Sequence, residues 1–250
     1  MKIALTVDLE RDVITDTFYG IKYGLPEILS IFDSEKVQAT FFTTGEIVKK
    51  FPNLIKEISI KHEIGIHGSY DHKRLNKVND EIILEIMNVK SYTEDLIGKK
   101  VYGFRAPYLD IDLKLLLKLK DLGFIYDSSI GTYRMNHYKM INYIDKDFEF
   151  IVMFPNVFFR FPMGDKIFPW LFRRSKDEIK IFYLHPWEAI NVRGLAKQLR
   201  PDYNFFYYLA RLDRWINTGK PFLNRLKKII KNLKKEGYEI KPLKDYVKEK

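Results

Sequence analysis

The chain contains no cysteine among its 250 residues. A disulfide framework, a thiolate zinc site and a cysteine nucleophile are therefore excluded, and any metal must take histidine or carboxylate ligands. The sequence lacks a run of roughly 18 apolar residues that could span a membrane, and the apolar stretch before Asp8 is too short for a signal-peptide core. It also lacks internal repeats and low-complexity linkers. We therefore expect a cytoplasmic protein, with at most a peripheral membrane contact.

The composition favours a single domain over residues 1–250. A hydrophobic content of 46% is enough for one sizeable core in a chain of this length. The formal net charge is +10, and much of it lies in a lysine-rich segment at residues 221–250. The apolar residues of that segment recur with helical spacing, which predicts a closing helix with a solvated basic face. The alternative is contact with a polyanion such as an anionic membrane surface; we expect no nucleic acid partner.

Short β-branched and apolar runs alternate with helical patterns along the chain. This alternation, with short connections, predicts a parallel sheet covered by helices, either open or closed into a barrel. Asn79 or Asp80 should cap one helix and Asp112 another, and Pro52 is a candidate interruption of a third. The predicted strands are residues 2–8, 37–45, 62–67, 101–108, 124–129 and 179–185, with a short one at 238–240.

Ionisable and imidazole side chains follow most of these strands. Because the carboxyl ends of parallel strands share one face, where ligands bind in α/β folds, residues scattered along the sequence should converge there. The residues concerned are Asp8, Glu10, His67, His72, Arg105, Asp127 and His185.

The residue types at this face suggest a hydrolytic metal site. Glu10, His67 and His72 offer one carboxylate and two imidazoles, a set that binds zinc and leaves a position for water. A cation there can lower the pKa of water to about 7. The alternative is that the two histidines are ordinary surface residues. Asp71 is a second possible ligand, because four residues separate His67 from His72.

The remaining residues can be given roles in proton transfer. Asp8 lies on the same side of its strand as Glu10 and could take the proton of an attacking water. Arg105 could bind Asp8 through a charge-assisted hydrogen bond. His185 could act as general acid, with Asp127 orienting it. Each has a structural alternative: an Asp8–Arg105 pair, a buried histidine, a turn aspartate. Their joint occurrence favours the catalytic interpretation.

Several motifs, in order, resemble the polysaccharide deacetylase superfamily, the NodB-homology carbohydrate esterases. TVDLE resembles the first aspartate motif, EIGIHGSYDH the histidine motif, FRAPY the arginine motif, YDSS the fifth-strand motif and LHPWE the last histidine motif. Leu9 separates the two acidic residues of the first motif, and the histidine motif has one residue more than usual.

The resemblance implies a deformed (β/α) barrel of about seven strands and metal-dependent removal of N-acetyl groups from amino sugars. It assigns Asp8 as base, Arg105 as its partner and His185 as acid. Glu10, His67 and His72 are its metal ligands, most simply for zinc. The expected substrate is an acetylated amino sugar of a glycan or glycolipid precursor. The alternatives are hydrolysis of a non-sugar amide or cyclic ureide, and an inactive basic module that binds a glycan or another polyanion.

An aromatic stretch at residues 154–172 is a candidate groove lining, because sugar rings present apolar faces to aromatic side chains. Trp170 is the best single probe, followed by Trp187 beside the last histidine motif and Tyr108 in the arginine motif. The alternative is that these rings fill the barrel wall or a subunit contact, since aromatics are ordinary core residues.

Overall fold

A computed structural model describes residues 2–130, 149–150, 160, 164 and 179–248. The expectation for Trp170 lies outside the described residues. Within them, no helix combines the length and apolar character needed to cross a bilayer.

The described strands form one parallel sheet with the order β6-β5-β4-β3-β2-β1-β7, and β8 pairs beside β1. This curled half-barrel confirms the predicted fold class. All five N-terminal strands and the late strand were predicted, and so was β8. The strands are β1 (Lys2–Leu9), β2 (Thr40–Thr43), β3 (Glu63–His67), β4 (Gly103–Arg105), β5 (Tyr126–Asp127), β6 (Glu149–Phe150), β7 (Ile179–Leu184) and β8 (Glu239–Ile240).

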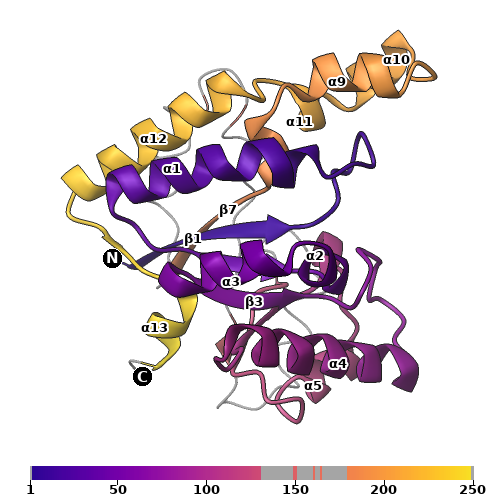
Figure 1. Ribbon diagram of the computed structural model, residues 1–250, viewed down its shortest axis with the longest axis vertical. Coiled ribbons are helices and arrows are strands. Elements are labelled where there is room, and N and C mark those ends of the chain that lie inside the picture. The colour runs from indigo at the N-terminus through magenta and orange to yellow at the C-terminus, as the bar shows by residue number, and fades with distance from the viewer. Residues whose placement is uncertain (1, 131–148, 151–159, 161–163, 165–178, 249–250) are drawn as a thin grey trace.

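Helices cover the outer side of the sheet in two groups (Figure 1). Near β1 and β7, α1 packs beside α12; near β3 and β4 lie α3, α4 and α5. The helices of these groups are α1 (Leu25–Glu35), α2 (Gly45–Lys50), α3 (Pro52–Lys61), α4 (Asp80–Ile97), α5 (Leu113–Lys118) and α12 (Lys220–Lys235). The others are α9 (Val192–Leu199), α10 (Phe205–Ala210), α11 (Leu212–Trp215) and α13 (Leu243–Lys248), and short helical turns are η1 (Gly20–Gly24), η2 (Pro107–Leu109) and η3 (Pro186–Ala189).

The residues predicted to begin or end helices do so in the structure. The side chains of Asn79 and Asp112 accept hydrogen bonds from the first turns of α4 and α5, which satisfies amide groups that have no partner inside the helix. Pro52 begins a new helix, so the predicted single helix is split into α2 and α3. Gly98 ends α4 in the left-handed conformation, with φ of 66°.

The C-terminal segment closes the amino end of the sheet. Tyr246 of α13 is buried, and its hydroxyl donates to the carbonyl of Ile3 at 3.1 Å. The amide of Lys244 donates to the buried Glu63 carboxylate at 3.0 Å, and Tyr126 donates to the other oxygen of Glu63 at 2.9 Å. The C-terminal segment thus covers the amino ends of β1 and β3, opposite the carboxyl ends where ligands bind in such folds.

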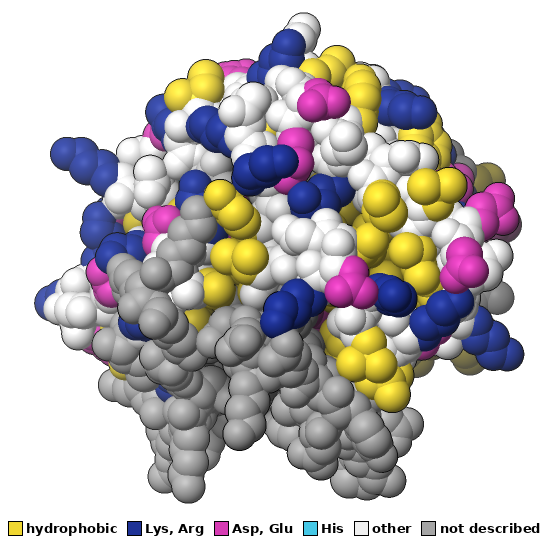
Figure 2. Space-filling model, turned by 90° about the horizontal axis from the view of Figure 1, so that it is seen from below, with side chains coloured by type: hydrophobic (Ala, Val, Ile, Leu, Met, Phe, Trp, Pro, Cys, Tyr) yellow, Lys and Arg dark blue, Asp and Glu magenta, His cyan; other side chains and the backbone are white. Residues whose placement is uncertain are grey.

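The positive charge is dispersed on the face that Figure 2 shows. Lys and Arg side chains of the described residues are scattered there among acidic, apolar and other groups. The described residues of that face therefore form no continuous basic strip of the kind that follows a nucleic acid backbone.

Candidate active site

The pleat of β1 explains the spacing of the first acidic pair. Leu9 is fully buried and belongs to the core cluster that includes α1 and α12 residues. Asp8 and Glu10 flank it and both line a cavity of about 270 Å³ on the opposite side of the strand. The intervening leucine thus packs against the helix layer while both carboxylates face the cavity.

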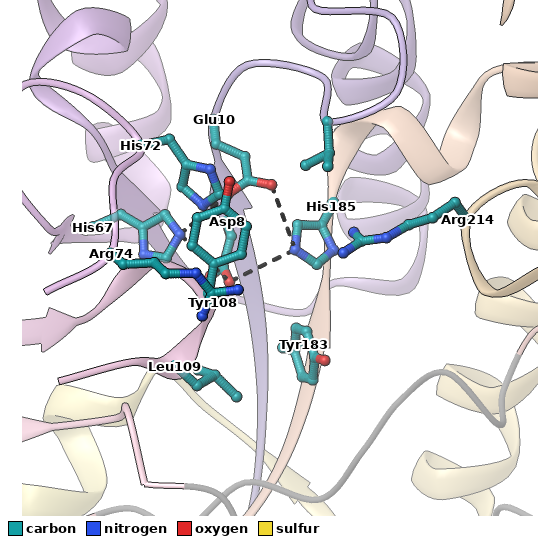
Figure 3. Close-up of a pocket in the computed structure, with 11 residues that line it drawn as sticks. Asp8, Glu10, His67, His72, Arg74, Tyr108, Leu109, Tyr183, His185 and Arg214 are labelled. Carbon is teal, nitrogen blue, oxygen red and sulfur yellow. Dashed lines mark hydrogen bonds and ion pairs between the residues drawn. The ribbon is translucent and has the colours of Figure 1, made fainter. Parts of the chain in front are cut away.

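Two histidines approach Glu10 from β3 and the loop after it (Figure 3). His67 ends β3, and its Nε2 lies 3.3 Å from Oε2 of Glu10. Nε2 of His72 lies 2.5 Å from the same oxygen. The loop turns at Gly68, where φ is 79° and an added Cβ would meet the Pro107 ring at 2.6 Å. The backbone thus turns directly after β3, ahead of His72.

These three residues are suited to hold a cation. One nitrogen or oxygen atom from each of Glu10, His67 and His72 lies within 4.8 Å of the other two. Nδ1 of His67 lies 3.0 Å from the carbonyl oxygen of Arg105, which can only accept, so Nδ1 donates and Nε2 keeps its lone pair in the neutral ring. Asp71 is exposed and lines a neighbouring groove instead. His72 is therefore the residue that joins the group in the described structure.

Electrostatics keep the central carboxylate ionised. Burial by itself raises the pKa of Glu10, but its contacts with His67 and His72 and the charge of His185 outweigh burial, so the pKa lies below its ordinary value. An ionised carboxylate is what a metal ligand requires.

Arg105 ends β4 and holds one oxygen of Asp8. Its side chain is fully buried, and Nη1 lies 2.5 Å from Oδ1 of Asp8 and 2.9 Å from the Thr6 hydroxyl. The other side of the guanidinium donates to the carbonyl and hydroxyl of Ser128 at 3.1 and 2.9 Å. Oδ2 of Asp8 lies 4.0 Å from Nε2 of His67 and 4.0 Å from Nε2 of His185. One carboxylate oxygen is fixed and the other faces the histidines.

His185 follows β7 and faces the group from the opposite side (Figure 3). Its Nε2 lies 3.8 Å from Oε1 of Glu10. Burial lowers the pKa of His185, but contacts with Glu188, Glu10 and Asp8 outweigh burial, so the pKa is raised. The raised pKa favours the protonated ring that a general acid needs.

The carboxylate beside His185 is Glu188, which corrects the expectation for Asp127. Oε2 of Glu188 lies 3.6 Å from Nδ1 of His185 and accepts the His185 amide at 2.8 Å. Oε1 of Glu188 lies 2.6 Å from Nε of Arg160. Asp127 bonds instead to Ser129, whose hydroxyl and amide donate to its two oxygens at 2.6 and 2.9 Å. Both oxygens of Asp127 thus accept hydrogen bonds within a short Asp-x-Ser turn. The one-turn helix η3 instead places Glu188 beside His185.

The expected substrate aromatics have different surroundings. Tyr108 lines the cavity, with its ring centroid 4.4 Å from that of His72. Trp187 is only 3% exposed, and its ring stacks on His185 with centroids 5.2 Å apart. Trp187 therefore supports the imidazole from behind rather than lining the cavity.

Sequence reasoning missed several residues of this region. Arg74 and Arg214 line the cavity, and the Arg74 guanidinium lies 4.7 Å from the Tyr108 ring centre. Tyr183 of β7 lines it too. Arg160, behind His185, is nearly fully buried. The alternating pattern of β7 could have pointed to Tyr183, two residues before His185 on the same side of the strand. The three arginines lie outside the predicted strands and carry no such signal.

The fold and the polar cavity at the carboxyl ends of its strands are typical of a (β/α)-barrel enzyme. The sequence model of the family described as polysaccharide deacetylase matches residues 2–126, half of the chain, and the chain belongs to this family.

Curated relatives match over part of their length. A peptidoglycan-N-acetylglucosamine deacetylase of Bacillus cereus is 40% identical over 88 residues, which cover 34% of this chain and 32% of the relative. A peptidoglycan deacetylase of Helicobacter pylori is 31% identical over 131 residues, which cover 49% of this chain and 42% of the relative. The matches thus span less than half the length of these two relatives.

Solved structures share the fold. A family 4 carbohydrate esterase from Bacillus anthracis aligns over the whole of this chain and 83% of its own, with a TM-score of 0.55 and 20% identity. A CE4 family pseudoenzyme from Bacillus anthracis aligns over 98% of this chain and 65% of its own, with a TM-score of 0.54 and 19% identity. The fold is therefore found in both active and inactive proteins.

Proposed function

We propose that this chain is a metal-dependent amidohydrolase that removes an N-acetyl group from an amino sugar of a glycan, and that residues 1–250 act as one catalytic domain. The observation that carries the proposal is the convergence of three candidate metal ligands, a clamped aspartate and a histidine on one cavity. Glycan N-deacetylation is supported by the names of the relatives, which act on peptidoglycan.

In this proposal Glu10, His67 and His72 hold the cation. Two imidazoles and one carboxylate favour zinc over a hard cation such as magnesium. The cation supplies Lewis acidity toward the acyl carbonyl and the attacking water. Nδ1 of His67 donates to the Arg105 carbonyl, which keeps the ring turned toward the site.

Asp8 is the proposed base. Arg105 occupies Oδ1, so the proton of the attacking water passes to Oδ2, which faces His67 and His185 at 4.0 Å. The buried guanidinium, bonded on its other side to Ser128, fixes the angle of the carboxylate and leaves little freedom for rearrangement during the reaction.

His185 is the proposed acid, and we assign Glu188 as the carboxylate that orients it. An amine is a poor leaving group, so it must be protonated as the amide bond breaks. Nε2 of His185 faces the cavity, where it can donate that proton, and Nδ1 faces Glu188. The ion pair from Arg160 to Glu188 and the Trp187 ring stacked on the imidazole hold this arrangement from behind.

Substrate contacts are proposed for the mouth of the cavity. Tyr108 is partly exposed there, so its ring can pack against the apolar face of a sugar. Arg74 and Arg214 add donors for hydroxyl or acidic groups of the glycan. Trp187 is not included, because it is buried.

The test combines metal analysis with acetate release. Purified protein should contain about one divalent ion per chain, as one three-residue site requires, and should release acetate from N-acetylated peptidoglycan or chitin fragments. Asp8→Asn serves as the control for contaminating activity. Bound metal without acetate release from any acetylated glycan would overturn the enzymatic proposal and favour an inactive binding module. Release from non-sugar amides alone would overturn the substrate class.

A further inference from the structure

The segment of α9, α10 and α11 exposes large apolar side chains away from the active site. In Figure 1 α9 and α10 extend outward from the body of the molecule. The exposed fraction is 41% for Leu199, 75% for Phe206 and 54% for Leu209. Several large exposed apolar side chains on one segment indicate a contact surface more strongly than an isolated one does.

The inner side of this segment is built into the protein. Val192 and Ala196 of α9 are buried in a cluster with Ile14 and Trp187. Tyr203 donates its hydroxyl to the carbonyl of Ile14 at 3.4 Å. The side chain of Asn204 accepts from the first turn of α10 at 2.9 Å. The exposed residues therefore project from an anchored scaffold with a capped helix.

The same segment is rich in basic residues. Residues 192–215 contain five Lys and Arg against two Asp, a net charge of +3. Arg193 and Lys197 line a hollow of about 380 Å³ together with Leu209 and Trp215. The Arg193 guanidinium lies 4.8 Å from the Trp215 ring centre. Aromatic and aliphatic residues combined with a basic rim are the composition of segments that lie at the interface of an anionic bilayer.

We propose that the surface of α9–α11 docks peripherally on an anionic phospholipid bilayer. Phe206 and Leu209 enter the boundary between headgroups and acyl chains, while Arg193 and Lys197 contact lipid phosphates. Arg214 of α11 lines the active-site cavity, so docking would hold the cavity close to the membrane surface. The interaction itself does not depend on catalysis.

This surface differs from the basic C-terminal segment, for which membrane contact is the alternative to a solvated basic face. The main apolar stripe of α12 is buried, and the exposed side of that helix carries mostly lysines. Such a side can attract anionic lipid at long range but carries no large, fully exposed apolar side chain to insert. The α9–α11 surface offers both interactions.

Co-sedimentation of the full chain with vesicles tests the proposal. Vesicles of phosphatidylcholine with about one third phosphatidylglycerol should bind the protein, and high salt or pure phosphatidylcholine should weaken the binding. The double variant Phe206→Ser/Leu209→Ser should lower the partition coefficient by at least about tenfold, because two large apolar groups no longer insert. The matched control, Ile60→Ser/Leu84→Ser, removes residues that are 74% and 55% exposed on α3 and α4 and should bind as wild type.

Four results would overturn the proposal. The first is that the wild-type protein does not bind the vesicles. The second is that Phe206→Ser/Leu209→Ser and the control Ile60→Ser/Leu84→Ser lose vesicle binding equally. The third is a loss of vesicle binding in Lys227→Glu/Lys231→Glu while Phe206→Ser/Leu209→Ser binds fully. That result would assign the membrane contact to α12. Light scattering should show the same mass for wild type and Phe206→Ser/Leu209→Ser; a wild-type dimer that the variant dissolves would assign the surface to a second copy instead. Unchanged melting temperatures confirm that the variants are folded.

Discussion

Oε2 of Glu188 lies 3.6 Å from Nδ1 of His185, on the side of the imidazole opposite the nitrogen that faces Asp8 and Glu10. Burial raises the pKa of Glu188, but the charge of Arg160 and the contact with His185 outweigh it, so the pKa lies below its ordinary value. An ionised Glu188 favours a proton on Nδ1 and directs Nε2 toward the substrate. The acid is thus oriented by a carboxylate three residues along the chain.

The first prediction concerns Glu188→Gln. It should lower the turnover of an N-acetylated sugar by about ten- to hundredfold, the usual effect of removing an orienting carboxylate. An activated phenyl acetate should be hydrolysed with a much smaller loss, because a phenolate leaves without protonation. Steady-state kinetics on both substrates check this. An equal loss on both would indicate a general structural role, and Asp127→Asn, the matched control, should not change the ratio of the two rates.

The second prediction concerns the metal. Glu10→Ala and His67→Ala should each lose most of the bound metal, because removal of one of three ligands leaves an incomplete coordination shell. Asp71→Ala is the matched control; its carboxylate is exposed and outside the group, so metal content should stay at the wild-type level. Elemental analysis after dialysis measures this. Retention of metal in both Glu10→Ala and His67→Ala would place the ion elsewhere.

The third prediction concerns Asp8→Asn. Turnover should fall by roughly two to four orders of magnitude, as expected for loss of a general base, while the metal content stays near wild type. The variant leaves Arg105 buried without its anionic partner, so some stability should be lost as well. Near-normal turnover in folded, metal-loaded variant protein would mean that another group deprotonates the water.

Much of the fold and of the site's position could be predicted from the sequence, because parallel strands place their carboxyl ends at one face. That rule alone brings Asp8, His67, Arg105 and His185 together. The pleat of β1 put Asp8 and Glu10 on one side, and cap residues marked the starts of α4 and α5. These are local or topological rules, which need no knowledge of packing.

The remaining features of the site depend on tertiary contacts, which the spacing of residues along the sequence does not reveal. Asp127 and Glu188 are both carboxylates close to strand ends, and sequence could not tell which one approaches His185. The answer depends on local turns: Ser129 captures Asp127, and η3 turns Glu188 back. Arg160 and Arg214 reach the site from segments outside the predicted strands, and the burial of Trp187 follows from its packing on α9 residues.

The last prediction uses Asp127 as a reporter of burial. Because it is buried, its pKa is raised from 3.8 to about 6, even though Ser129 and Arg105 act in the opposite direction. Between these two values the folded state binds a proton that the unfolded state has released, so stability falls as pH rises through this window. Asp127→Asn cannot titrate. The unfolding free energy of Asp127→Asn minus that of wild type should therefore rise by about 2 kcal/mol between pH 4 and pH 8, because only the wild type is destabilised over this range. A shift of one pKa unit corresponds to about 1.36 kcal/mol. Urea denaturation across this range measures the difference, and other titrating groups cancel because both proteins contain them. A difference that is independent of pH would mean that Asp127 keeps an ordinary pKa in the folded protein.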